Sequence, residues 1–232
     1  MAQFTPAYSS LVKQLDEVET LRRLASESEK TDPIGASKEI NALCRSAVVL
    51  LCAHLEAYVR ELGDVTLDSI HAKAVPRNAV STRFYYHLSK DLLSEVRDTA
   101  DHSRIALKVF EFIERDLASW SRTGPFPDPL SSERFNQGFA NPAFKKVKKY
   151  FNRFGFAEYQ QEMGATLQAH YQTTVNMIDH LVDTRNKIAH GDPNASKTPA
   201  EVQEMTETVR RFCRVTDQVF ANWCRDQLCA IR

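Results

Sequence analysis

The longest regular pattern in the sequence runs from Ser37 to about Ile70 and predicts one long α-helix. Apolar residues recur there at the three- and four-residue spacing of one helical face. They are Val48, Leu51, Cys52, Leu55, Tyr58, Val59 and Leu62. The turn from Ala47 to Ala53 is apolar on every side. Because a helix that is apolar all round is normally buried, we expect this one at the centre of the core.

The rest of the chain also favours helices. Only 7 of the 232 residues are glycine, and a low glycine content disfavours tight-turned sheets. Asn141-Pro142 is expected to open a helix as N-cap and first-turn proline, and Thr198-Pro199-Ala200-Glu201 is a capping box. Further helices are predicted at about 8–29, 88–97, 105–120, 141–154, 161–190 and 198–229. We therefore expect an all-α bundle of about six or seven helices.

The length and composition fit one domain over residues 1–232, because domains typically have about 100–200 residues. We expect an N-terminal helix within 1–30, a core over 37–230 and a proline-rich loop over 123–140. No segment approaches the ~18 uncharged apolar residues of a membrane span, and the first residues do not resemble a secretory signal. We expect a cytoplasmic protein without membrane contact.

The charge and cysteine content limit the kinds of partner and ligand that the protein is expected to have. Lys plus Arg and Asp plus Glu each number 30, so RNA binding must come from a local patch of positive charge. The five cysteines include no C-x-x-C pair, which predicts reduced thiols in the core. Six histidines show no ligand spacing, namely His54, His71, His87, His102, His170 and His180. We expect no metal site and no cofactor.

Arg185 conflicts with the pattern around it. It falls inside an apolar stripe formed by Ile178, Leu181, Val182, Ile188 and Ala189. A buried charge without a partner costs several kcal/mol. Arg185 therefore has a carboxylate partner, or it faces a cleft or a second subunit. An ordinary structural ion pair remains an alternative to a functional site at this point.

The residues after Arg185 favour a functional site. Asn186 follows directly, and His190 comes at the helix end, where Gly191 supplies the left-handed stop. A helix C-terminus favours a protonated imidazole by ~0.3–1 kcal/mol, so His190 is placed to give and take a proton. A lone histidine at this position would more often be a simple cap. Here it accompanies an arginine and an amide.

These residues resemble the HEPN superfamily. Arg185-Asn186-Lys187-Ile188-Ala189-His190 matches the R-x4-6-H signature of HEPN domains. Glu56 to Arg60 resembles the E-x3-[K/R] element of the superfamily. Asn141-Pro142 and the later F-N-R-F-G-F are similar to the RiboL-PSP-HEPN type. The resemblance covers three elements in the same order between Cys44 and Gly191.

The resemblance implies a domain that dimerises so that two R-x4-6-H motifs share one cleft. Many members of the superfamily act as metal-independent endoribonucleases at that cleft. His190 would act as general acid or base, and Arg185 would hold the phosphate oxygens. Asn186 would orient the phosphate or the histidine. Glu56 would support Arg185, or would simply pair with Arg60 four residues later.

Helix geometry supports a shared cleft. On a regular helix with about 100° per residue, Arg185 and His190 point ~140° apart. One helix cannot easily present both side chains to one phosphate. Pairing Arg185 of one chain with His190 of the other would solve the difficulty, and so would partial unwinding from Ala189 to Gly191.

A basic run at 144–154 offers a weaker signal for RNA. Lys145, Lys146, Lys148 and Lys149 alternate with aromatic residues, as phosphate contacts and base stacking would require. However, Phe144, Val147, Phe151 and Phe154 share one helical face, so a core stripe with a solvated lysine face is favoured.

Two functions remain open. The first is an endoribonuclease in defence, toxin action or stress response, with a protein regulator or antitoxin as a further partner. The second is a non-catalytic dimer that binds RNA, a nucleotide or a protein. HEPN toxins silenced by adenylylation typically carry tyrosine two residues after the motif histidine, and this chain has Asp192 there. That mode of control is therefore in doubt.

Overall fold

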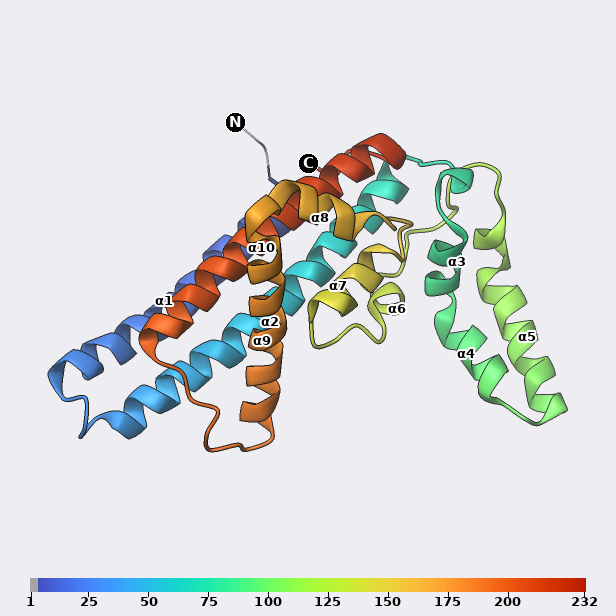
Figure 1. The fold of residues 1–232 in the computed structure, drawn as a ribbon. Coiled ribbons are helices and arrows are strands. Elements are labelled where there is room, and N and C mark those ends of the chain that lie inside the picture. Colours follow the sequence, from blue (N-terminus) through green and yellow to red (C-terminus); the bar gives the residue numbers. More distant parts are fainter. Residues whose placement is uncertain (1–3) are drawn as a thin grey trace.

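The structure is a computed structural model and describes residues 4–232, so residues 1–3 of the expected N-terminal segment lie outside the described part. Three long helices lie side by side (Figure 1), namely α1 (Pro6–Thr31), α2 (Ser37–Ala72) and α10 (Pro199–Gln227). α2 packs against α1, α9 and α10, and buried residues follow one another along it from Cys44 to Ile70. The predicted all-α class and the central position of this helix are confirmed.

α2 also has the length and apolar composition of a membrane-crossing helix, which the sequence reasoning did not anticipate. About 44% of its most apolar 18-residue window is buried inside the bundle. The core helix of a compact bundle meets the same criterion, and α2 occupies that position here. Its apolar composition therefore serves packing against α1, α9 and α10.

The C-terminal helix begins as predicted. Thr198 accepts a hydrogen bond from the backbone N–H of Glu201, and the Glu201 carboxylate accepts one from the Thr198 N–H at 2.8 Å. This reciprocal capping box fixes the start of α10 at Pro199. Four cysteines are buried free thiols, namely Cys44, Cys52, Cys213 and Cys224, and Cys229 is half-buried.

The helix predicted over 161–190 is broken into two. α8 (Tyr159–Leu167) ends at Gln168, whose backbone has a positive φ of 49°, and α9 (Tyr171–Ala189) leaves in a new direction (Figure 1). No glycine or proline marks the break. α8 packs against α10, whereas α9 packs against both α2 and α10, so tertiary packing overrides a continuous helical pattern.

The prediction that Asn141 and Pro142 open a helix is wrong. α7 spans Phe144–Phe151, and Asn141 lies before it with a positive φ of 55°. The backbone N–H of Phe144 donates instead to the Asp179 carboxylate at 2.8 Å. A side chain from α9 therefore caps α7 and frees Asn141 for another contact.

The middle of the chain forms an arm that projects from the bundle (Figure 1). It contains α3 (Thr82–Leu88), α4 (Lys90–Asp98) and α5 (His102–Asp116), and α6 (Ser132–Asn136) joins it to the bundle. The short helices α3 and α6 were not predicted. With the break between α8 and α9, they explain why the described chain has more helices than expected. The loop around Thr123 to Pro129 is irregular, as predicted.

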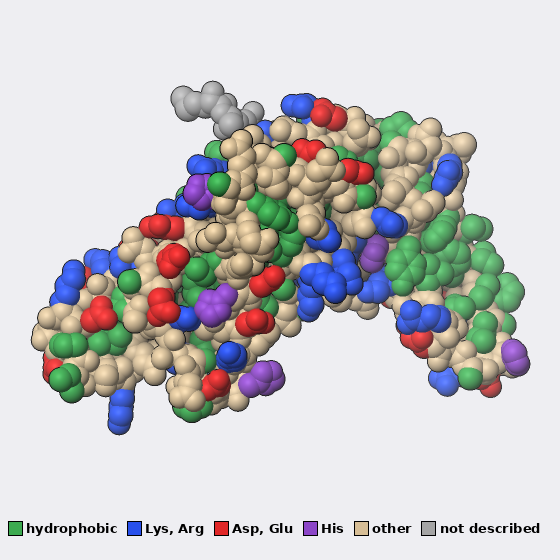
Figure 2. Space-filling view, in the orientation of Figure 1, with side chains coloured by type: hydrophobic (Ala, Val, Ile, Leu, Met, Phe, Trp, Pro, Cys, Tyr) green, Lys and Arg blue, Asp and Glu red, His purple; other side chains and the backbone are tan. Residues whose placement is uncertain are grey.

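A buried carboxylate fastens the arm. Asp116 accepts hydrogen bonds from Arg115 at 2.9 Å and from Arg134 of α6 at 2.6 Å. Burial raises the pKa of Asp116, but hydrogen bonds from Arg115, Ser89 and Arg134 outweigh burial and leave this pKa below its usual value. Asp116 is therefore ionised and joins α5 to α6. The outer face of α5 stays exposed and apolar, with Leu107 64% and Phe110 62% exposed (Figure 2).

Candidate functional site

α9 ends at His190, its C-cap residue, in a standard C-terminal capping motif. The N–H of Gly191 donates to Ile188 O and the N–H of Asp192 donates to Lys187 O, both at 3.0 Å. This is the Schellman pattern, and Gly191 adopts the positive φ of 79° that it requires. The predicted left-handed stop is confirmed. His190 itself is exposed.

α9 keeps helical geometry up to the motif histidine. The N–H of His190 still donates to Asn186 O at 2.9 Å, and α9 extends through Ala189. The helix is therefore not unwound before His190, so unwinding does not turn His190 toward Arg185. The divergent directions expected for these two side chains follow from a regular helix.

Arg185 is half-buried and hydrogen-bonded to two amides. Its Nη1 donates to Asn141 Oδ1 at 2.8 Å and to Asn186 Oδ1 at 3.1 Å. Leu181 and Ile178 are buried on the same helix, but Ala189 is exposed, so the predicted stripe stops short of the helix end. Arg185 lies at the edge of the apolar stripe, where it reaches both the protein interior and the surface.

Glu56 does not pair with Arg185. Its Oε1 accepts from Arg60 at 2.9 Å, and its Oε2 accepts from the backbone N–H of Asn141 at 3.0 Å. Within residues 4–232, no salt bridge joins Arg185 to an acidic side chain. The simple Glu56–Arg60 pair was the alternative reading and is the one formed. Glu56 reaches Arg185 only through Asn141.

Asn141 is the site residue that sequence reasoning missed. Its side chain binds Arg185 and its backbone binds Glu56. Its left-handed backbone is uncommon outside glycine, although asparagine tolerates it better than most residues. Backbone strain of this kind persists where surrounding contacts enforce it, often at functional sites. The Asn-Pro pair was visible in the sequence, but the signal was attributed to a helix start.

Three cations hold the segment from Phe139 to Asn141. Arg60 donates to Phe139 O at 2.5 Å, and Lys146 Nζ donates to Ala140 O at 2.9 Å. Arg185 binds the Asn141 side chain. Glu56 is the carboxylate that hydrogen-bonds this segment. The arrangement concentrates positive charge beside the motif, as an anion-binding site requires.

α7 has a buried apolar face and a lysine face toward solvent, as the sequence favoured. Phe144, Val147, Phe151 and Phe154 are buried, so these aromatic rings are not available to stack on bases. Lys145, Lys146 and Lys149 are exposed, and Lys148 is half-buried with its Nζ donating to Gln160 at 2.8 Å. Figure 2 shows Lys and Arg side chains gathered over this part of the molecule. The lysines can offer phosphate contacts but α7 offers no stacking platform.

A buried thiol lies close to the same residues. Burial raises the pKa of Cys52 to about 11, the Arg185 charge lowers it and the Glu56 charge raises it. Cys52 is therefore a protonated thiol at neutral pH. Because the thiolate is the reactive form, Cys52 is not a nucleophile.

An apolar groove runs along the outer face of α2 beside the motif. Its volume is about 630 Å³. Its lining comes from α1, α2 and α9 and is small or apolar apart from Arg45; the residues are Leu21, Ala42, Arg45, Ser46, Val49, Leu50, Ala53 and Ile188. Arg45 also donates to Asp192 O at 2.8 Å, which fixes the loop after His190. The groove therefore joins the exposed face of α2 to the end of the motif.

Fold and site define an all-helical protein with an R-x4-6-H motif at the end of a bundle helix. A family comparison identifies the same class: the RiboL-PSP-HEPN model matches residues 9–222. The chain belongs to the RiboL-PSP-HEPN family. The search of curated proteins found no match to the chain, and the search of solved structures found none. Family membership is consistent with a nuclease or RNA-related role.

Proposed function

We propose that the protein is a metal-independent endoribonuclease that acts as a cytoplasmic dimer in defence, toxin action or stress response. The observation that carries this proposal is the convergence of Arg60, Lys146 and Arg185 on the segment 139–141, with an exposed His190 at the end of the helix that carries Arg185. Fixed positive charge and an accessible imidazole suit phosphodiester transfer, because the charge binds the phosphate and the imidazole transfers the proton once a second chain brings the two together.

The reaction would proceed by attack of the RNA 2′-oxygen on the adjacent phosphorus. The new O–P bond closes a 2′,3′-cyclic phosphate, and the bond to the 5′-oxygen breaks. His190 takes the 2′-hydroxyl proton or gives a proton to the leaving 5′-oxygen. Arg185 holds the non-bridging oxygens, and its bonds to Asn141 and Asn186 fix its direction. Asn186 thereby orients the arginine.

A second copy of the chain is the expected partner. The α2 groove presents Ala42, Ser46, Val49 and Ala53 without an acidic side chain, and Ile188 of the motif forms part of its lining. Small residues allow a second helix to approach closely. A two-fold dimer on this face would bring each His190 toward the Arg185 of the other chain. On this proposal the interface comprises the outer face of α2 and the end of α9.

The direct test is incubation of the purified protein with end-labelled RNA in EDTA. We expect cleavage that leaves a cyclic phosphate and a 5′-hydroxyl. A substrate with 2′-hydrogen at the scissile nucleotide should remain intact. Binding without cleavage would instead support the second function, a HEPN dimer that holds RNA, a nucleotide or a protein. Cleavage of the 2′-deoxy substrate would contradict the mechanism.

A further inference from the structure

The cations that hold the segment 139–141 continue toward the arm. Gly138, which precedes this segment, lies against Lys90 of α4, because a Cβ on Gly138 would approach Lys90 Nζ to 3.1 Å. Lys90 is half-buried, and within residues 4–232 its amine makes no hydrogen bond or ion pair. Residues 138–141 extend over at most about 11 Å, since consecutive Cα atoms are ~3.8 Å apart. Lys90 and Arg185 therefore contact the two ends of one short row of positive charge.

Nearby carboxylates do not neutralise Lys90. Each acidic side chain of α4 already has a basic partner in the arm; the pairs are Asp91 with Arg115, Glu95 with Lys108, and Asp98 with Arg97. On the bundle side, Glu56 pairs with Arg60. Asp64 accepts a hydrogen bond from Asn136 at 2.7 Å. The charge of Lys90 is therefore available to an anion from outside the chain.

A second row of cations follows α7 beside the first. Lys146 donates to Ala140 O at 2.9 Å, and Arg153, just past the end of α7, donates to Phe135 O. α7 therefore runs alongside the segment between these two carbonyls. Lys149 lies between the two cations in the chain; it is exposed and makes no hydrogen bond or ion pair in the described part of the protein. Figure 2 shows Lys and Arg side chains gathered here, between α9 and the arm.

Two buried groups reflect this excess of positive charge. Arg153 is only 8% exposed, and its contacts are Phe135 O and the face of Tyr150, whose ring centroid lies 5.0 Å from Cζ. Neither contact carries a negative charge, and arginine stays protonated in proteins. Burial, with the charges of Arg153 and Lys90, lowers the pKa of His87 to about 3. Both charges act on one imidazole, so they lie close to the place where α3 and α4 meet the end of α7.

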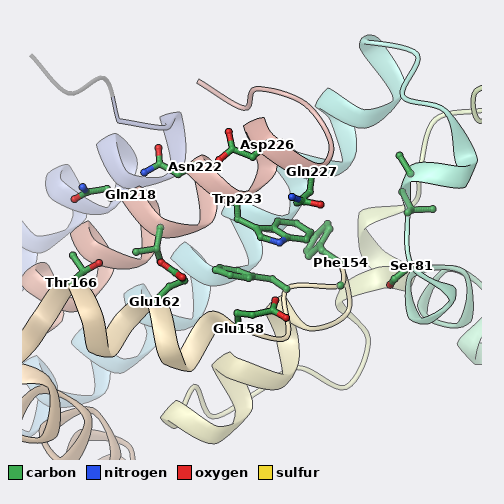
Figure 3. Close-up of a pocket in the computed structure, with 15 residues that line it drawn as sticks. Ser81, Phe154, Glu158, Glu162, Thr166, Gln218, Asn222, Trp223, Asp226 and Gln227 are labelled. Atoms are coloured by element: carbon green, nitrogen blue, oxygen red, sulfur yellow. The ribbon is translucent and has the colours of Figure 1, made fainter.

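The surface beyond the end of α7 is acidic. A cavity of about 680 Å³ opens there between α8 and the C-terminal half of α10 (Figure 3). Its charged lining residues are Glu158, Glu162 and Asp226, and no lysine, arginine or histidine lines it. A polyanion is repelled from this side, because like charges repel it electrostatically. The positive surface therefore leads from the motif toward the arm and not toward α8.

We propose that the two rows form one cationic track, which holds the phosphates of a single RNA strand on its way from the cleavage site to the arm. This inference rests on the proposed ribonuclease function and adds where the rest of the substrate lies. The row along 138–141 offers room for about two or three phosphates, because charges on one strand repeat every ~3.4 Å of helix axis. The aromatic rings of α7 are buried, so the track contacts the RNA backbone and does not stack on bases. The residues of the track are Arg185, Arg60, Lys146, Lys149 and Lys90.

Binding of a non-cleavable 2′-O-methyl RNA tests the track separately from cleavage. A fluorescent strand of about 20 nucleotides should bind Lys90→Gln with Lys149→Gln more weakly, and the slope of log affinity against log salt should fall by about 1.4, because each phosphate contact on a single strand contributes ~0.7. Neither lysine has a bonding partner within residues 4–232, so the fold should be retained. A strand of about 3 nucleotides is too short to fill the track and should bind the variant and the unmodified protein equally.

The matched control is Lys13→Gln with Lys30→Gln. Both lysines are exposed on α1, which packs against α2 and α10, so this variant loses the same charge away from the track and should bind normally. Unchanged affinity and salt slope in the Lys90/Lys149 variant would overturn the track. An equal loss in the control or with the short strand would do so too. Equal affinity of the unmodified protein for poly-glutamate would identify an acidic protein as the occupant and would overturn the assignment to RNA.

Cleavage assays on the same proteins separate the two proposals. If the Lys90/Lys149 variant binds RNA normally while the unmodified protein cleaves it, the track is wrong and the ribonuclease proposal stands. If binding depends on both lysines but the unmodified protein does not cleave RNA, the ribonuclease proposal is wrong and the track stands as an RNA-binding surface. When both are right, the variant should raise KM for long RNA and leave kcat nearly unchanged, because the track touches no reacting atom.

Discussion

Arg185 donates a 2.8 Å hydrogen bond to the side chain of Asn141, a residue 44 positions earlier in the chain. The backbone N–H of Asn141 in turn donates to Glu56 at 3.0 Å. The E-x3-[K/R] element of α2 and the motif of α9 are therefore connected through the loop before α7. Asn141 sets where the guanidinium of Arg185 lies.

Replacing Asn141 tests this connection. Asn141→Gly removes the acceptor for Arg185 but keeps the positive φ of 55° accessible, so it avoids backbone strain. A hydrogen bond to a charged group contributes ~1.5–3 kcal/mol, so we expect cleavage to slow by about tenfold or more. Single-turnover kinetics provide the measurement. Asn141→Ala adds strain and should also lower the melting temperature. An unchanged rate in Asn141→Gly would show that Arg185 needs no such support.

Glu56→Gln should have a smaller effect on cleavage and stability than the Asn141 variants. The amide can still accept the Asn141 N–H, but it loses the ion pair with Arg60 at 2.9 Å. Since this pair is part-exposed, we expect a stability loss of ~1 kcal/mol or less in urea unfolding. A large loss of stability would mean that Glu56 compensates Arg185 directly.

The dimer can be tested on the outer face of α2. Ala53→Glu places a charge in the apolar groove and should convert the dimer to a monomer, because an unpaired charge at an interface is costly. Light scattering at micromolar concentration gives the mass. Ala165→Glu on the exposed surface of α8 is the control. If the unmodified protein is already a monomer, the dimer proposal is wrong.

A mixing experiment tests whether the site is shared. Arg185→Ala and His190→Ala should each be inactive alone. In a mixed dimer, Arg185 of one chain and His190 of the other still meet in one intact site. Mixing the variants under subunit exchange should therefore restore part of the activity. Absence of any restored cleavage would place both residues of the site in one chain.

Much of the fold follows from local signals in the sequence. The capping box at Thr198 fixes the start of α10, and Gly191 fixes the end of α9. The break at Gln168 has no such signal, because it depends on α8 and α9 packing against different helices. Likewise, Asp179 caps α7 from another helix, and the sequence around Asn141 alone favours a different helix start.

The candidate site was predictable in its residue types but not in its contacts. Arg185 stood out as a charge within an apolar stripe, and that conflict reflects a real half-buried arginine. Its partners could not be inferred, since the sequence left open a carboxylate, a cleft or a second subunit, whereas Arg185 binds the amides of Asn141 and Asn186. The connection from Glu56 through Asn141 to Arg185 depends on the loop conformation of Asn141, which no short-range sequence pattern specifies.

The lowered pKa of His87 should make the stability of the fold depend on pH. Burial, with contributions from Arg153 and Lys90, lowers the pKa of His87 to about 3. The unfolded chain takes up this proton near pH 6.5 and the folded chain does not, so stability should fall as the pH drops below about 6.5. Melting temperatures at pH 7 and pH 5 provide the measurement. His87→Phe should reduce the difference between them, and an unchanged difference would rule out this origin.

The most direct test of the central claim is the cleavage rate of His190→Ala. The side chain is exposed at a helix end whose backbone bonds do not need it, so fold and dimer should be retained. Loss of a general acid or base should slow RNA cleavage by ~10²-fold or more, with RNA binding nearly unchanged. His180→Ala, an exposed histidine on the same helix, should cleave normally. Cleavage by His190→Ala at the native rate would contradict the account.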